Sequence, residues 1–119
     1  MKTLRVLLVE DEVLIAMLFA EVLEDMGHNV CAIEATETDA VAAAARCQPD
    51  LMIVDARLRQ GSGVSAVAEI LRSRFIPHVF VTGESSRVQA LRPDAVVLQK
   101  PFFASDLVRA MQRALGAHP

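Results

Sequence analysis

The chain has 119 residues, of which 53% are apolar, and its formal net charge at neutral pH is −3. A chain of this length fits one domain and can bury a core without disulfide or metal support. No apolar run approaches the roughly 20 residues of a membrane-spanning helix, and the scattered arginines offer no continuous basic surface to nucleic acid. We therefore expect one cytoplasmic domain over residues 1–119, with neither a membrane nor a nucleic acid as its partner.

Short apolar runs alternate with segments of helical period along the whole chain. The run 4–9 is almost continuously aliphatic, which is typical of a strand buried on both faces. The expected strands are 4–9, 28–33, 51–54, 78–81 and 95–98. The expected helices are 13–26, Thr36 or Thr38 to 47, 64–74, 86–91, and one that opens at Ser105 or Asp106. Five βα units with right-handed crossovers predict an α/β fold with a parallel sheet between two helix layers.

Apolar residues at helical spacing define the faces that should pack on the sheet. The predicted core positions are Ile15, Leu18, Phe19, Val22 and Met26 in the first helix, Val64, Val67, Ala68 and Leu71 in the third, and Leu107, Val108, Met111 and Leu115 in the last. Gly27 and Pro49 supply the stops after the first and second helices.

The two cysteines, Cys31 and Cys47, lack the paired spacing of a zinc site. Cys31 falls in an apolar run and Cys47 at the expected end of a helix. The simplest interpretation is a pair of buried, inert thiols in a reducing compartment.

Reactive polar residues follow four of the expected strands. Glu10 and Asp11 follow the first strand, Asp55 the third, Thr82 the fourth and Lys100 the fifth. The carboxyl ends of parallel strands share one edge of the sheet, so these side chains should meet in one pocket. Three carboxylates, a hydroxyl and an ammonium suit a divalent metal beside an aspartate that accepts phosphate.

The acids after the first strand have two interpretations. Glu10, Asp11 and Glu12 could simply occupy a helix start, where negative charge is favourable. If the first and third strands are neighbours, however, Asp55 lies beside Asp11, and two carboxylates about 5 Å apart repel by roughly 3 kcal/mol at an effective dielectric of about 20. The fold would then need a cation or a raised pKa, and Mg²⁺ suits a site with few carboxylates and several waters.

Asp55 would form an acyl phosphate if it acted as a nucleophile. The metal, Lys100 and the Thr82 hydroxyl could each contact one phosphoryl oxygen. The plainer alternatives are a solvated lysine and an ordinary strand-to-turn exit at Thr82. Gly83 has no side chain and so leaves the approach to the pocket open, and a cis peptide bond before Pro101 would turn the chain sharply next to Lys100.

Four motifs give the chain a resemblance to a known family. They are VEDE at 9–12, IVDARL at 53–58, VTGE at 81–84 and QKPF at 99–102. Together they resemble the receiver domain of two-component response regulators over the whole chain. The resemblance implies a flavodoxin-like (βα)5 three-layer sandwich whose five-stranded parallel sheet has the order 2-1-3-4-5.

The same resemblance implies a role for each pocket residue. Asp55 would take a phosphoryl group from a histidine kinase or a histidine phosphotransfer protein. Mg²⁺ or Mn²⁺ would be bound by Asp55, by Asp11 directly, by Glu10 through water and by the backbone carbonyl of Arg57. Thr82 and Lys100 would sense the phosphate. The chain would catalyse only its own phosphorylation and dephosphorylation, so it is not expected to be an enzyme with an external substrate.

The chain departs from the family pattern at the fifth strand. Most receivers carry an aromatic residue three positions before the lysine, and Val97 stands there. A conformational signal would then leave through the loop at Gly83, through Phe80, or through Phe102 and Phe103. The stretch FVTG from Phe80 resembles a receiver subgroup that lacks the same aromatic residue.

Residues around the pocket suggest how it is regulated and where partners bind. Arg57 and Glu84 lie two residues beyond Asp55 and Thr82, where the family sets its hydrolysis rate, and they could pair across the pocket mouth as a gate for water. Leu14 and Met17 lie off the core face of the first helix. They are either scattered exposed residues, which are common, or a docking strip for a phosphotransfer helix or a second copy of the chain in a homodimer.

Three other classes of protein are alternatives to the receiver. A flavodoxin-type cofactor binder would carry a phosphate loop rich in Ser, Thr and Gly after the first strand, where this chain has acids of the wrong sign. An aspartate-based phosphohydrolase would need aspartates where Glu10 and Glu12 stand. The more serious alternative is a phosphorylation-independent interaction module with a receiver fold. We expect a single receiver domain, without an output domain, that acts as a phosphorylation-dependent switch or phosphate shuttle.

Overall fold

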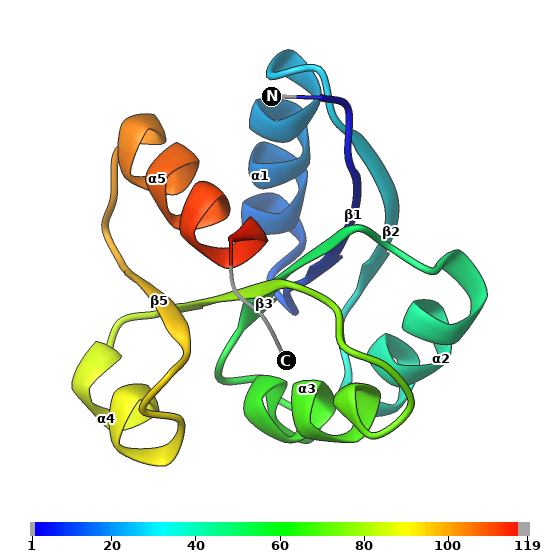
Figure 1. Ribbon diagram of the computed structural model, residues 1–119, viewed down its shortest axis with the longest axis vertical. Coiled ribbons are helices and arrows are strands. Elements are labelled where there is room, and N and C mark those ends of the chain that lie inside the picture. Colours follow the sequence, from blue (N-terminus) through cyan, green and yellow to red (C-terminus); the bar gives the residue numbers. More distant parts are fainter. Residues whose placement is uncertain (1, 117–119) are drawn as a thin grey trace.

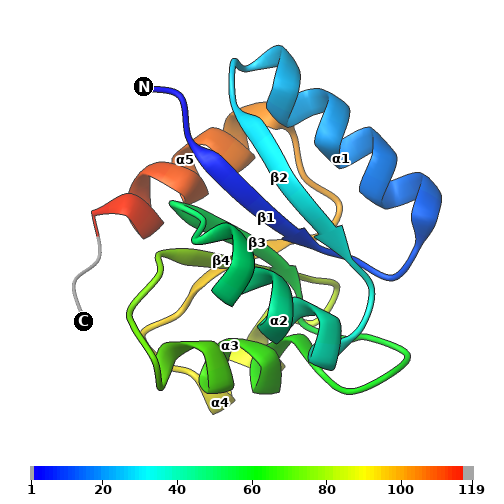
Figure 2. The same ribbon diagram turned by 90° about the vertical axis from the view of Figure 1, so that its right-hand side faces the viewer.

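The fold is a five-stranded sheet, and helices cover both of its faces (Figures 1 and 2). A computed structural model describes residues 2–116. The strands are β1 (Arg5–Val9), β2 (Asn29–Glu34), β3 (Leu51–Asp55), β4 (His78–Thr82) and β5 (Val96–Gln99). The helices are α1 (Val13–Asp25), α2 (Glu37–Cys47), α3 (Gly63–Leu71), α4 (Ser85–Leu91) and α5 (Ala104–Leu115).

The strand order is β2-β1-β3-β4-β5, and each neighbouring pair is parallel. Helices α1 and α5 cover one face of the sheet, and α2, α3 and α4 cover the other (Figure 1). The predicted flavodoxin-like sandwich and its strand order are confirmed. Because β1 lies between β2 and β3, the residues that follow β1 and end β3 come out side by side at one edge of the sheet.

The core consists of two apolar layers, one on each face of the sheet. Alternate residues of a strand enter opposite layers, so Val6 and Leu8 pack with α1 and α5, whereas Leu7 and Val9 pack with α2 and α3. All four of these side chains are almost completely buried. Burial on both faces explains why the strand is aliphatic at every position from Val6 to Val9 rather than at alternate ones.

The predicted helix faces are only partly correct. In α1 the buried residues are Ala16, Phe19 and Leu23, whereas Leu18 is 64% and Val22 38% exposed. The face of α1 that meets the sheet is therefore rotated from the predicted one. Leu18 and Val22 instead line an apolar groove of about 270 Å³ between α1 and the start of α5, which the sheet does not reach.

The third and last helices show smaller shifts. In α3, Ala66, Val67 and Ile70 are buried with Gly63, whereas the predicted core residue Ala68 is exposed. The helix also begins one residue earlier than predicted and ends at Leu71 rather than Arg74. In α5, Leu107 and Met111 are buried as predicted, together with Ala110 and Ala114, while Val108 and Leu115 are only partly buried.

Local signals set several helix ends. Thr36 caps α2 by accepting a hydrogen bond from the Asp39 amide at 3.1 Å, which selects it over Thr38. Gly27 follows α1 with a φ of +94°, a conformation that favours glycine. The start of α5 differs from the prediction, because the helix begins at Ala104 and the Asp106 carboxylate accepts from the Phe103 amide at 2.8 Å.

The two cysteines are half-buried rather than buried, which corrects the expectation for them. The Cys47 thiol donates to the Cys31 carbonyl oxygen at 3.6 Å. Burial, with the neighbouring Cys47 thiol, raises the pKa of Cys31 to about 11, so this thiol stays protonated near neutral pH. Within residues 2–116, none of the helices combines the length and the apolar character needed to cross a bilayer.

Candidate functional site

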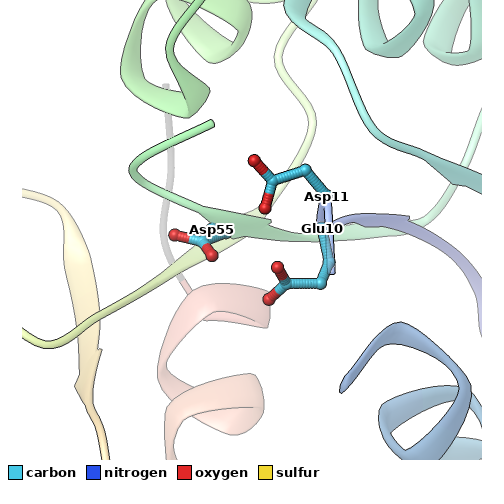
Figure 3. A group of neighbouring side chains, drawn as sticks. All are labelled: Glu10, Asp11 and Asp55. Atoms are coloured by element: carbon cyan, nitrogen blue, oxygen red, sulfur yellow. The ribbon is translucent and has the colours of Figure 1, made fainter. Parts of the chain in front are cut away.

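Three carboxylates meet beyond the ends of β1 and β3 (Figure 3). Glu10 and Asp11 directly follow β1, and Asp55 is the last residue of β3. One carboxylate oxygen from each residue lies within 4.8 Å of the others. Glu10 is almost completely buried, whereas Asp11 and Asp55 are partly exposed, so the cluster is open to solvent on one side.

The cluster holds more negative charge than its surroundings balance. Burial, followed by the charge of Asp55, raises the pKa of Glu10 to about 7, although the Glu12 amide and Lys100 act in the opposite direction. Near neutral pH the Glu10 carboxyl group is therefore protonated in about half of the molecules. Hard oxygen ligands, a net negative charge and an opening to water are the properties of a Mg²⁺ site, so the residues present fit such an ion.

Lys100 supplies the cation closest to this cluster in the described structure. Its Nζ lies 3.4 Å from Oδ2 of Asp55 and 3.7 Å from Oε1 of Glu10. The residue directly follows β5, and the peptide bond between Lys100 and Pro101 is cis. One ammonium therefore faces two of the three carboxylates.

Thr82 ends β4, next to the strand that carries Asp55. Its side chain is buried, and its hydroxyl oxygen accepts from the Glu84 amide at 3.0 Å. Its carbonyl oxygen accepts from the Lys100 amide at 2.8 Å. The hydroxyl and the ammonium thus come from adjacent strand ends that are joined by a backbone hydrogen bond.

Backbone amides of the loop after β3 orient two of the carboxylates. Oδ1 of Asp55 accepts from the Arg57 amide at 3.0 Å, and Oδ2 of Asp11 accepts from the Arg59 amide at 2.6 Å. The loop from Arg57 to Ser62 closes with a bridge between these two residues. The assignment of the Arg57 carbonyl as a metal ligand stays a prediction.

Exposed ion pairs surround the mouth of the site. The Arg57 guanidinium lies 2.7 Å from a Glu84 oxygen, and Arg87 lies 3.1 Å from the other oxygen of the same carboxylate. Arg87 and then Arg57 lower the pKa of Glu84, which stays ionised. These side chains line an open pocket of about 290 Å³ that also includes Thr82. The pairing of Arg57 with Glu84 agrees with the expectation from the sequence; a role in hydrolysis stays a prediction.

Two residues near the site were not recognised from the sequence. A Cβ atom at Gly63 would lie 1.9 Å from the Asp55 carbonyl oxygen, so only glycine fits where α3 starts against the end of β3. Gln99 hydrogen-bonds the loop that follows Thr82. The loop sequence contains two glycines, Gly61 and Gly63, but it does not show which of them touches Asp55. No sequence pattern distinguishes Gln99.

The comparisons with known proteins agree with this geometry. The model of the response regulator receiver domain matches residues 6–112. The chain belongs to the response regulator receiver family. Val97, on β5 opposite Phe80 of β4, marks it as a receiver without the usual aromatic residue on the fifth strand.

Two curated bacterial regulators contain a segment that is similar to this chain. It is 36% identical over 116 residues to the transcriptional regulatory protein PdtaR of Mycobacterium tuberculosis, covering 94% of this chain and 57% of that protein. It is 35% identical over 114 residues to the phyllosphere-induced regulator PhyR of Methylorubrum extorquens, covering 92% of this chain and 43% of PhyR. The chain thus spans about half the length of the curated relatives it matches.

A solved structure extends the likeness to three dimensions. The NMR structure of the PhyR receiver domain of Erythrobacter litoralis superimposes with a TM-score of 0.85 at 33% identity. The alignment covers 95% of this chain and 90% of that one. The similarity therefore includes the whole sheet and the helices on both of its faces.

Proposed function

We propose that this receiver accepts a phosphoryl group on Asp55 from a histidine kinase or a histidine phosphotransfer protein, and acts as a phosphorylation-dependent switch or phosphate shuttle. The observation that carries the proposal is the cluster of Glu10, Asp11 and Asp55 with Lys100 at 3.4 Å from the Asp55 carboxylate. Three carboxylates within 4.8 Å of one another repel, so a purely structural role does not explain why they gather at an open edge of the sheet.

In the transfer, a carboxylate oxygen of Asp55 bonds to phosphorus as the bond from phosphorus to the donor histidine nitrogen breaks. The electron pair of that bond stays on the imidazole, and the product is an acyl phosphate. Hydrolysis reverses the change, because water attacks phosphorus and returns the Asp55 carboxylate with inorganic phosphate. Both steps occur on the chain itself, so no external substrate is turned over.

Asp11, Asp55, Glu10 through water and the Arg57 carbonyl would hold Mg²⁺ or Mn²⁺. When bound, the ion supplies positive charge that offsets the carboxylates and the incoming phosphoryl oxygens. Lys100 contributes a second positive charge from β5, on the side of Asp55 that its Nζ already faces. Thr82 can donate its hydroxyl proton to a phosphoryl oxygen, because the bond that it accepts from the Glu84 amide uses only a lone pair of its oxygen.

Intact-mass analysis with acetyl phosphate tests this proposal. Wild type should gain the mass of one phosphate in the presence of Mg²⁺ and none in EDTA, while Asp55→Asn should gain none in either. Asp50→Asn is a matched control at the opposite edge of the sheet, where the carboxylate binds the Arg5 amide, and it should gain phosphate as wild type does. Absence of any gain in wild type would favour an interaction module that works without phosphorylation.

The first turns of α1 offer a docking strip for the phosphate donor. Leu14 is 75% and Met17 59% exposed, as predicted, and they lie on the helix that follows Glu10 and Asp11. Exposed apolar side chains beside a charged pocket suit the apolar face of a partner helix.

Lysine substitutions separate docking from chemistry. Leu14→Lys with Met17→Lys should slow phosphorylation by a histidine phosphotransfer protein that labels wild type, and leave labelling by acetyl phosphate unchanged. Leu91→Lys is a control on α4, where the side chain is 66% exposed on the other face of the sheet. Equal rates for the double variant and wild type with the protein donor would exclude the strip as its docking site.

A further inference from the structure

Gln99, the last residue of β5, links the phosphate site to α4. Its side-chain oxygen accepts from the Ser85 amide at 2.9 Å, and its side-chain nitrogen donates to the Gly83 carbonyl at 2.8 Å. The same nitrogen lies 3.2 Å from the carbonyl oxygen of Lys100. One primary amide thus contacts both sides of the β4–α4 loop and the residue that pairs with Asp55.

The bond to Ser85 compensates for a weak helix start. Ser85 is the first residue of α4, and the residue before it, Glu84, makes no side-chain capping bond. Because the first amides of a helix lack partners inside the helix, an acceptor from elsewhere stabilises it. Gln99 supplies that acceptor from the neighbouring strand. A seven-residue helix is short, so its position depends strongly on such tertiary contacts.

The other side of the same loop is attached to the phosphate site. The Thr82 hydroxyl accepts from the Glu84 amide at 3.0 Å, one residue from the Ser85 amide that Gln99 binds. If the Thr82 side chain shifts to bring its hydroxyl to a phosphoryl oxygen on Asp55, the oxygen that accepts from the Glu84 amide moves with it. Gly83 lies between these two residues, and a Cβ atom there would meet nothing within 4 Å, so the space beside the loop is open. The bonds from Gln99 to Gly83 and Ser85 must then break or carry the movement into α4.

We propose that Gln99 is a positioning residue that couples the phosphoryl state of Asp55 to the N-terminal turn of α4. This inference rests on the proposed function, because it needs a phosphoryl group on Asp55. It assigns the signal to the loop at Gly83 in a receiver where Val97 replaces the usual aromatic side chain. Phe80 is less suited to the task, since it is fully buried and the guanidinium over its ring, that of Arg92, lies at the far end of α4.

Two-dimensional ¹⁵N–¹H NMR with Mg²⁺ and beryllofluoride, a mimic of the aspartyl phosphate, tests the coupling. In wild type, shifts should appear at Ala56 and Arg57 beside Asp55, at Ser85 and Val88 in α4, and at the side-chain amide of Gln99. Gln99→Met keeps the length of the side chain and removes its hydrogen bonds. In this variant the shifts beside Asp55 should persist, while those at Ser85 and Val88 fall to less than half of their wild-type size.

Two further variants control for a merely loosened helix. Gln89→Met removes the side-chain amide that binds the Ala95 carbonyl at the other end of α4, and it should keep the response of Ser85 and Val88. Ser85→Pro removes the donor instead of Gln99, at a first-turn position where proline is tolerated, and it should lose the Val88 response as Gln99→Met does. A dispersed spectrum shows that each variant is folded.

The outcomes separate the inference from the proposed function. A wild-type response at Val88 in either Gln99→Met or Ser85→Pro would overturn the inference, and so would an equal loss in Gln89→Met. If wild type itself showed no shift at Ala56 and Arg57, the phosphoacceptor function would fail first, before any variant was compared.

Discussion

The two edges of the sheet surround their polar side chains in different ways. At the amino ends of the strands, three polar side chains each bind a backbone group: Nδ1 of His28 accepts from the Leu4 amide, the Asp50 carboxylate accepts from the Arg5 amide, and His78 pairs with the Ile76 carbonyl. At the carboxyl ends, Glu10, Asp11 and Asp55 also accept backbone amides, but their three carboxylates face one another.

This difference distinguishes the structural polar groups of the amino edge from those of the candidate functional site. In the described part of the chain, every buried side-chain nitrogen or oxygen has a hydrogen-bond partner, so the difference is not caused by unpaired buried groups at either edge. At the amino edge, each polar group and its partner are complementary. At the carboxyl edge, three carboxylates lie together with too little positive charge to balance them. Repulsion between the carboxylates does not stabilise the fold by itself, and it indicates a ligand that completes the site.

The largest effect on the stability of the fold should come from substitution of Gly63, where the start of α3 packs against the end of β3. In Gly63→Ala, the new methyl group would lie 1.9 Å from the Asp55 carbonyl oxygen, so β3 or α3 must shift. Overpacking of this kind costs about 1–3 kcal/mol or more in the free energy of unfolding. Urea denaturation should show the loss, and acetyl phosphate labelling of the folded variant should also slow.

Gly83→Ala is the matched control on the other side of the same pocket. A Cβ atom there meets nothing within 4 Å, so the free energy of unfolding should stay close to that of wild type. Equal stability of the two alanine variants would mean that the contact between α3 and Asp55 does not constrain the site.

The next largest effect is the response to Mg²⁺. At a concentration one hundred times its dissociation constant, a ligand of the folded state stabilises it by about 2.7 kcal/mol. Thermal unfolding of wild type should shift upward with Mg²⁺, and Asp11→Asn should lose most of that shift. Without the metal, Asp11→Asn is relieved of up to ~3 kcal/mol of repulsion, because one of the repelling charges is gone. It also weakens the bond that the Asp11 carboxylate accepts from the Arg59 amide, by about 0.5–1.5 kcal/mol, so the variant should be more stable than wild type by about 2 kcal/mol.

Asp50→Asn makes the same chemical change at the amino edge with the opposite sign. Its carboxylate accepts from the Arg5 amide at 2.8 Å, so removal of the charge weakens a favourable bond by about 0.5–1.5 kcal/mol. Mg²⁺ should stabilise this variant as much as wild type. The contrast between the edges would collapse if both asparagine variants changed stability in the same direction without metal.

The sequence was sufficient to predict the strands to within one residue at each end, and the meeting of Asp11 with Asp55. Runs such as 51–54 are aliphatic throughout, and a parallel order that puts the first and third strands side by side leaves only one edge for the residues that follow them. The pairing of Arg57 with Glu84 was also accessible, because both residues lie two positions beyond the ends of neighbouring strands.

Helix faces and close contacts could not be obtained in this way. Leu18 continues the apolar pattern of α1 but lies in the groove beside α5, because the width of an apolar stripe does not tell how much of it the sheet covers. The role of Gly63 depends on a single distance to the Asp55 carbonyl, and that of Gln99 on partners 14 and 16 residues away. Both depend on contacts between different elements of the fold, which a local sequence pattern does not predict.

A smaller effect tests the amino edge through pH. Burial, with a smaller contribution from Arg92, lowers the pKa of His78 from its ordinary value near 6.5. The unfolded chain therefore binds a proton below about pH 6.5 that the folded chain does not, and the stability of the fold falls as the pH falls. In His78→Asn, urea midpoints between pH 6.5 and 5 should fall less steeply than in wild type. Parallel curves would show that His78 titrates alike in both states.

The smallest effect concerns the exposed charges at the mouth of the carboxyl edge. Glu84 pairs with Arg57 and Arg87 in solvent, so Glu84→Ala should leave the stability of the fold almost unchanged. It should shorten the lifetime of the phosphorylated form, because water reaches Asp55 more easily once the pair over the mouth is lost. The change should be less than about tenfold, since one exposed ion pair is a weak barrier.

The loss of phosphate over time, followed by intact mass, measures this lifetime. Glu69→Ala, which breaks the exposed pair with Arg72 at the end of α3, is the control and should keep the wild-type lifetime. Identical decay in wild type and Glu84→Ala would remove the gate and leave the buried groups alone to set the lifetime.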